Sequence, residues 1–247
     1  MSEAVVAGAQ ADIAGGRGRG HTLLRAVVVA AMLTAAVMVV TPATGATTGS
    51  ANGNGAERAA PHTGVAAVAQ ANGSDQNVYY VGANGQVYNW FYNGSWSNGP
   101  LGSGEAAKSG SGIAAVSQSS GNQNVYYVGA NGQVYNWFYN GSWSNGPLGS
   151  GEAAKSGSGI AAFFDQLNED QYVYYVGANG QIYTWLYNNG SWSNGPLGSG
   201  EAAESGTEIA AVLQSNGTGQ NVYYVGNNPK IYNWVYTESD TWHNKKL

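Results

Sequence analysis

The 247-residue sequence has no cysteine, so no disulfide can hold the fold together and no thiol can act as a nucleophile. It has only three histidines, His21, His62 and His243, and none of them recurs in the repeats described below, so the repeats share no histidine base. No spacing of side chains resembles a metal site. We therefore predict that the protein is not an enzyme and that it binds neither a cofactor nor a metal.

Charged residues are also scarce, at 9% of the chain, and most of them are acidic. Beyond residue 46 the sequence has six basic and twelve acidic residues, which gives that part a net charge of 6 − 12 = −6. No basic face remains for phosphate groups, which excludes nucleic acid as a partner. The 38 glycines and the 12% of aromatic residues favour a turn-rich all-β fold over a helical one.

The N-terminal segment has the features of an export signal. Three arginines precede the apolar run AVVVAAMLTAAVMVV at 26–40, and small residues follow this run. Because this order is typical of a secretory signal, we predict that residues 1–46 are a signal peptide and that the protein is secreted. The alternative is a membrane anchor, since residues 26–45 are long enough to cross a bilayer. Residues 47–63 lack apolar periodicity and are predicted to form a flexible linker.

Residues 64–247 consist of four repeats with a period of about 47 residues. The repeats cover 64–111, 112–158, 159–207 and 208–247. They contain all 17 tyrosines and all eight tryptophans of the chain. The first tryptophan of each repeat, which we expect in the core, is Trp90, Trp137, Trp185 or Trp234. The second tryptophan is Trp96, Trp143, Trp192 or Trp242.

Each repeat contains four short candidate strands, which in the second repeat are GIAAVSQ, NVYYVGA, QVYNWFYN and SWSNGPL. The pairs Asn131-Gly132 and Asn140-Gly141 supply the positive φ angles that tight antiparallel turns need. In VYNWFY, strand alternation places Trp137 on one face and Phe138 on the other, so both faces of the sheet carry aromatic rings that must be covered.

This pattern predicts an all-β fold, namely a β-propeller built from four repeated four-stranded antiparallel blades of about 47 residues. In such a fold each blade covers both of its faces with neighbouring blades. A β-sandwich is the competing fold, but a sandwich gives no reason for a strict repeat.

The repeat GIAAVSQ…NVYYVGANGQVYNWFYNGSWSNGPLG resembles that of the fungal and bacterial fucose-specific lectins of the Aleuria aurantia lectin type. The resemblance implies a propeller in which each sugar lies between adjacent blades. It also implies that an Arg before the VYY strand and a Glu in the next strand bind the sugar, while a Trp stacks on it. The Arg positions here are Asn77, Asn124, Tyr172 and Asn221. The Glu positions are Asn89, Asn136, Thr184 and Asn233, and the stacking positions keep Trp96, Trp143, Trp192 and Trp242.

Replacement of the Arg and Glu pair by neutral groups removes charge-assisted hydrogen bonds, so the fucose specificity of this family is in doubt for this chain. Asn still offers a donor and an acceptor to sugar hydroxyls, and the indole offers a platform to the apolar sugar face. The main interpretation is a secreted multivalent carbohydrate-binding protein that recognises glycans on cell surfaces or polysaccharides, with fucosylated glycans as one candidate class. The alternative is a non-catalytic secreted scaffold or protein-interaction propeller that has lost the sugar site.

The number of repeats raises the question of ring closure, because relatives of this type form six-bladed rings. We expect a monomer in which the fourth repeat packs on the first to close a four-bladed ring, a number of blades that propellers allow. The alternative is a dimer in which two chains share a ring of eight blades.

Overall fold

The computed structural model describes residues 58–60, 63–70, 73–214, 219–237 and 241–247. The predicted signal peptide and its anchor alternative lie outside these residues, as does most of the predicted linker. Within the described residues, no helix is long and apolar enough to span a membrane.

The described chain forms sixteen strands in four sheets, which confirms the predicted all-β fold with one four-stranded sheet per repeat. Blade 1 contains β1 (Val65–Ala69), β2 (Gln76–Val81), β3 (Val87–Tyr92) and β4 (Trp96–Pro100). Blade 2 contains β5 (Ile113–Ser117), β6 (Gln123–Val128), β7 (Val134–Tyr139) and β8 (Trp143–Pro147). Blade 3 contains β9 (Ile160–Asp165), β10 (Asp170–Val176), β11 (Ile182–Asn188) and β12 (Ser191–Pro196). Blade 4 contains β13 (Ile209–Leu213), β14 (Gln220–Val225), β15 (Ile231–Tyr236) and β16 (Trp242–Lys246).

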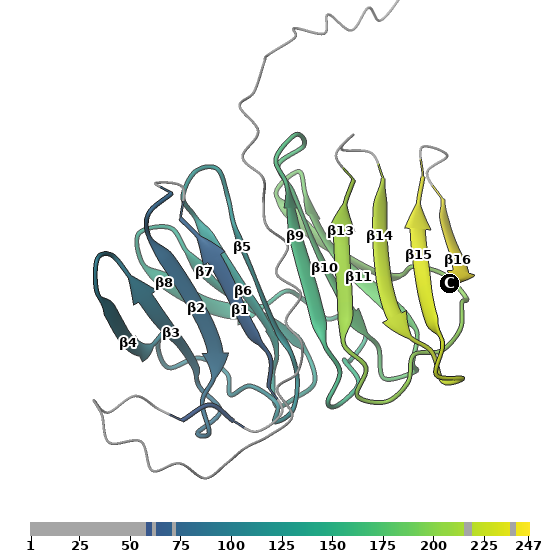
Figure 1. Cartoon of the computed structure of the whole chain (residues 1–247), viewed down its shortest axis with the longest axis horizontal. Helices are drawn as coiled ribbons and strands as arrows, with labels where there is room; N and C mark the ends of the chain where they lie inside the picture. Colours follow the sequence, from purple (N-terminus) through teal and green to yellow (C-terminus); the bar gives the residue numbers. More distant parts are fainter. Residues whose placement is uncertain (1–57, 61–62, 71–72, 215–218, 238–240) are drawn as a thin grey trace, which may run out of the picture. The chain divides into compact units, whose positions relative to one another are not determined.

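Within each sheet the strands follow one another in chain order and pair antiparallel, as β13 to β16 show (Figure 1). The turns between them have the predicted chemistry. Gly132 and Gly141 have φ angles of 84° and 105°, in the region that glycine adopts without strain. The side-chain oxygen of Asn131 accepts a hydrogen bond from the backbone N–H of Gln133 at 2.9 Å, which fixes the β6–β7 turn.

Each blade has two different faces. We call the side that packs on the next blade the forward face and the opposite side the rear face. The register of β6, β7 and β8 places Asn124, Tyr126, Val128, Val134 and Asn136 on the forward face of blade 2. It places Gln123, Val125, Tyr127, Trp137, Trp143 and Asn145 on the rear face. This is the alternation that the sequence predicts, with large rings on both faces.

Three apolar cores lie between successive blades. The core between blades 1 and 2 joins Tyr79 and Val87 of one forward face to Val125 and Trp137 of the next rear face. The same positions form the core between blades 2 and 3 and the core between blades 3 and 4. Trp137, Trp185 and Trp234 are buried as predicted, whereas Trp90 of blade 1 is only half-buried.

The expectation that blade 4 packs on blade 1 within one chain is wrong. The inner strands contact one another in the order β1, β5, β9 and β13, and no comparable contact joins β13 to β1 among the described strands. At the two ends, Trp96 is 50% exposed and Ile231 is 54% exposed. A four-bladed ring needs a turn of about 90° between neighbouring blades.

The acidic segment at 165–170 connects β9 to β10 in a hairpin. Among the described residues, no cluster of side chains suits a metal ion. Asp165 is buried and accepts hydrogen bonds from the backbone N–H of Leu167 at 2.9 Å and from Asn168 Nδ2 at 2.8 Å. Asp170 lies directly opposite Asp165 in the register.

Burial, together with the negative charge of Asp165, raises the pKa of Asp170 above its usual value. A raised folded-state pKa means that the folded form is stabilised below the unfolded pKa and loses this stabilisation as the pH rises through the folded pKa. Asp170→Asn should therefore raise the melting temperature by about 1–2 °C at pH 7 and leave it unchanged at pH 3. Thermal melts at both pH values test this, and Asp165→Asn is the control that should destabilise. An equal shift at both pH values would contradict the electrostatic explanation.

Candidate functional site

The second tryptophan of a repeat contacts the blade before its own. The indole of Trp143 in blade 2 lies edge-on to the ring of Tyr79 in blade 1, with ring centroids 6.0 Å apart. Trp192 makes the same contact with Tyr126 at 6.0 Å, and Trp242 with Tyr174 at 6.1 Å. These three tryptophans are half-buried, so each keeps part of its indole exposed at a junction.

The asparagines at the Arg and Glu positions form a pair on the forward face. Asn89 donates a hydrogen bond through Nδ2 to Oδ1 of Asn77 at 2.7 Å, and Asn136 donates one to Asn124 at 2.8 Å. Because Asn89 is opposite Tyr79 in the register, this pair lies beside the ring that contacts Trp143. The residues predicted to bind sugar thus come together across a junction, with two from one blade and the tryptophan from the next.

Each pair retains unused hydrogen-bonding groups. Nδ2 of Asn77 and Oδ1 of Asn89 are buried and have no partner among the described residues, and the same holds for Nδ2 of Asn124 and Oδ1 of Asn136. A buried polar group without a partner costs about 1–3 kcal/mol. A hydroxyl group, which both donates and accepts, has the chemistry to satisfy one donor and one acceptor. Asn77 and Asn124 are buried, whereas Asn89 and Asn136 are half-buried and are therefore the members nearer to solvent.

The junction between blades 3 and 4 differs from the other two. Thr184 donates its hydroxyl to the backbone oxygen of Trp185 at 3.3 Å and so does not pair with Tyr172. The ring of Tyr172 instead stacks on Tyr174 at a centroid distance of 6.4 Å and packs near Phe163. Burial raises the pKa of Tyr172 to about 12, so its phenol is a neutral group at physiological pH. This junction offers more aromatic surface and fewer amide groups.

The fourth set of predicted residues is divided between the two ends of the described blades. Asn233 donates to Asn221 at 3.0 Å on the forward face of blade 4, and both side chains are buried. Trp96, the remaining tryptophan, lies on the rear face of blade 1 and packs against Trp90 and Tyr92 of its own blade. Within the described blades, three of the four predicted combinations are therefore brought together.

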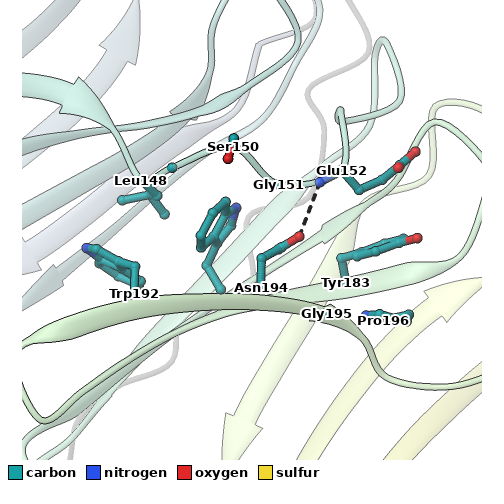
Figure 2. Close-up of a pocket in the computed structure, with 11 residues that line it drawn as sticks. Leu148, Ser150, Gly151, Glu152, Tyr183, Trp192, Asn194, Gly195 and Pro196 are labelled. Atoms are coloured by element: carbon teal, nitrogen blue, oxygen red, sulfur yellow. Dashed lines mark hydrogen bonds between the residues drawn. The ribbon is translucent and has the colours of Figure 1, made fainter.

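A pocket of about 560 Å³ lies at the junction of blades 2 and 3. The segment 148–152 forms one wall, and residues of the rear face of blade 3, including Trp185, Trp192 and Asn194, form the other (Figure 2). Asn194 Oδ1 accepts a hydrogen bond from the backbone N–H of Glu152 at 3.2 Å, shown as the dashed line in Figure 2. The half-buried indole of Trp192 thus lines this pocket and also contacts Tyr126.

Sequence reasoning missed the role of the asparagine two residues after the second tryptophan. Asn145 accepts from the N–H of Glu105 at 3.1 Å and donates to the backbone oxygen of Asn136 at 3.2 Å. It also bonds the hydroxyl of Tyr127, which in turn donates to the backbone oxygen of Glu105 at 2.9 Å. Asn145 therefore ties the connecting segment of one blade to the next blade. The signal was present in the sequence, because an asparagine occupies this position in all four repeats.

No curated protein matches the chain, but several solved structures do. A lectin of Aleuria aurantia described as a six-bladed β-propeller with a novel mode of fucose recognition matches with 27% identity and a TM-score of 0.61. The match covers 74% of this chain and 61% of that lectin. A variant of the same lectin in complex with Fucα1-6GlcNAc gives 27% identity and a TM-score of 0.60, over 74% of this chain and 62% of that one.

A lectin of Burkholderia pseudomallei matches with 20% identity and a TM-score of 0.63, over 76% of this chain and 55% of that chain, and supports the fold alone. This chain thus spans less than two thirds of the length of the lectins that it matches. Together with the four antiparallel sheets, these matches establish the β-propeller lectin fold. The model of the fungal fucose-specific lectins matches residues 60–247, which is most of the chain, and the chain therefore belongs to the fungal fucose-specific lectin family.

Proposed function

We propose that the protein is a secreted, multivalent, non-catalytic lectin that binds sugars at its blade junctions. The observation that carries this proposal is the combination of a half-exposed indole and a forward face with unused polar groups, which recurs at successive junctions. Trp143 lies against Tyr79 beside the Asn77–Asn89 pair, and Trp192 lies against Tyr126 beside the Asn124–Asn136 pair.

The chemistry of the proposed sites follows from these groups. The indole provides an apolar platform for one face of a sugar ring. A sugar hydroxyl would donate to Oδ1 of Asn89 and accept from Nδ2 of Asn77, the two atoms that have no partner among the described residues. Because both atoms are covered, the half-buried Asn89 side chain would have to rotate to admit the hydroxyl.

The sites contain no charged group at the two positions that carry Arg and Glu in the family pattern. Neutral hydrogen bonds are about half as strong as charge-assisted ones, so we expect weak binding at each single site. Several weak sites that engage one glycan-coated surface gain avidity of about a hundredfold or more. A variant of the Aleuria aurantia lectin has been solved in complex with Fucα1-6GlcNAc and with α-methyl-L-fucoside, and fucosylated glycans are thus the first candidates for this chain.

A glycan array, with free fucose as competitor, tests the function. Binding that fucose displaces would support a fucose-binding lectin, and binding that fucose does not displace would indicate a lectin of another specificity. If no glycan is bound, the lectin proposal fails, and the alternative of a protein-interaction propeller without a sugar site is favoured.

The contribution of the indole can be tested at a single junction. Trp143→Ala should remove one sugar site per chain, because the apolar platform is lost, whereas Trp143→Phe should keep a weaker site at the same position. Calorimetric titration gives the number of sites for each variant. We expect Trp143→Ala to lower the free energy of unfolding by about 0.5–1.5 kcal/mol through loss of its ring contact with Tyr79. An unchanged number of sites in Trp143→Ala would show that Trp143 only packs the junction.

A further inference from the structure

We propose that the forward face of blade 4 packs on the rear face of blade 1 of a second copy of this chain. We further propose that this contact forms a fourth sugar site from residues of both copies. The contact itself follows from packing alone. The fourth site rests on the proposed function.

The forward face of blade 4 has the same types of residue as the forward faces of blades 1 to 3, but no described blade packs on it. Ile231 occupies the position of Val87, Val134 and Ile182, which are all buried in the three cores, but it is 54% exposed. The N–H of Leu247 donates to the oxygen of Ile231 at 3.0 Å, as the N–H of Leu101 does to Val87 at 2.9 Å. Leu101 is buried, whereas Leu247 is 64% exposed. Blade 4 therefore makes the same backbone hydrogen bond as blade 1, but the side chains of Ile231 and Leu247 are not covered by a neighbouring blade.

The rear face of blade 1 lacks its cover in the same way. Gln76 is exposed, whereas its equivalents Gln123, Gln171 and Gln220 are buried. Trp90 is half-buried, whereas the equivalent tryptophans of the other blades are buried. Trp96 is 50% exposed, whereas the equivalent tryptophans are half-buried against the preceding blade.

At three junctions of the chain, the forward face of one blade packs on the rear face of the next. The two open faces have the same types of residue at these positions and are therefore complementary. At each formed junction a forward-face tyrosine donates its hydroxyl to a rear-face glutamine, in the pairs Tyr79–Gln123, Tyr126–Gln171 and Tyr174–Gln220. The same tyrosines contact the second tryptophan of the next blade. Tyr223 of blade 4 is half-buried and has the same position, so its partners across the new junction would be Gln76 and Trp96 of the second copy.

One residue of blade 4 departs from the other blades but does not block the contact. Lys245 occupies the position of Gly99, Gly146 and Gly195 on the forward face. A Cβ atom built on any of these three glycines meets no atom within 4 Å, although all three lie on forward faces at formed junctions. The junction therefore has room for a side chain at this position.

The second copy also completes the divided site. Asn221 and Asn233 lie on the forward face of blade 4, and Trp96 lies on the rear face of blade 1. The new junction would bring the asparagine pair of one copy beside the indole of the other, as in the first two junctions. If each copy covers the open faces of the other, two chains form a ring of eight blades, the upper end of the usual propeller range of about four to eight.

Light scattering of the purified protein at micromolar concentration tests the contact. We expect about twice the chain mass of 25.5 kDa if the full chain is measured. Ile231→Lys blocks the forward face of blade 4, and Trp96→Lys blocks the rear face of blade 1, so each variant alone should have the mass of one chain. A mixture of the two variants should regain the double mass, because each one supplies the face that the other has lost. Leu167→Lys is the control, since Leu167 is exposed outside both faces and its substitution should leave the mass unchanged.

A wild-type mass of one chain would overturn the proposal, and so would a mixture of folded variants that does not associate. A larger mass that rises with concentration and that Ile231→Lys abolishes would support the same contact in an open assembly. Circular dichroism of each variant verifies that it is folded.

Calorimetric titration with α-methyl-L-fucoside tests the shared site separately. We expect four sites per chain in the wild type and three in Ile231→Lys. Equal numbers of sites in an associating wild type and a monomeric variant would refute the shared site and leave the contact intact. If neither protein binds the sugar, the result counts against the proposed function, and the mass alone decides the contact.

Discussion

Replacing Tyr126 with alanine should lower the free energy of unfolding by about 3–5 kcal/mol, as other losses of large core aromatic side chains do. Tyr126 is 0% exposed, and its ring packs edge-on against Trp192. Its hydroxyl donates to Gln171, whose side chain is also buried and would lose this partner. The substitution thus opens a cavity and leaves a buried amide unpaired in the same junction. Urea unfolding followed by tryptophan fluorescence gives the change.

The repeat supplies a matched control at the same position of blade 4. Tyr223→Ala removes the same side chain from a face that none of the described blades covers, and Tyr223 is only half-buried. At protein concentrations low enough to keep the chain monomeric, Tyr223→Ala should therefore cost much less than Tyr126→Ala. Equal costs would show that the two faces are covered alike, which contradicts the open end of blade 4.

The second large effect is expected from adding a single methyl group. Gly151→Ala should destabilise the protein by about 1–3 kcal/mol, because the new Cβ would overpack a filled junction. It would lie 2.5 Å from Cζ2 of Trp185 and 2.6 Å from Oδ1 of Asn194, which already bonds the N–H of Glu152. Trp185 or Asn194 must move, and movement of Asn194 would break its hydrogen bond with Glu152, which links the connecting segment to blade 3.

Gly146→Ala is the control for this prediction. A Cβ at Gly146 meets nothing within 4 Å, so the change in the free energy of unfolding should stay within about 0.5 kcal/mol. Comparison of the two variants by urea unfolding separates a steric cost from a general intolerance of alanine in glycine-rich segments. If both variants are neutral, the segment at 148–152 does not pack as closely on Trp185 as the structure shows.

Much of the fold could be predicted from local patterns. The strands of blade 2 follow from alternating residues and Asn-Gly turns, which depend on neighbours in the same hairpin and which the sequence shows directly. The burial of Trp137 depends on more than its own hairpin, because Trp90 in the identical segment VYNWFY is only half-buried.

Ring closure could not be predicted in this way. It depends on the angle between neighbouring sheets, and this angle is set by how Tyr79, Trp137 and Trp143 fill the space between two blades. The same limit applies to Asn145, whose partners Glu105 and Tyr127 belong to two different repeats. The repetition shows that such positions matter, but only the packed junction shows what they contact.

The candidate site depends both on local sequence patterns and on packing between repeats. The sequence and its family resemblance indicate Asn77, Asn89 and a recurring tryptophan. The structure shows that the tryptophan next to this pair is Trp143 of the following repeat, because the forward face of one blade meets the rear face of the next. The roles of these residues in sugar binding remain predictions.

The central claim is that sugars bind at the blade junctions, and a crystal structure of the protein with the glycan that binds best on the array tests it most directly. We predict a sugar ring stacked on Trp143 and another on Trp192, each with a hydroxyl within hydrogen-bonding distance of Asn89 or Asn136. A sugar bound away from all junctions, with these four side chains unchanged, would contradict the claim.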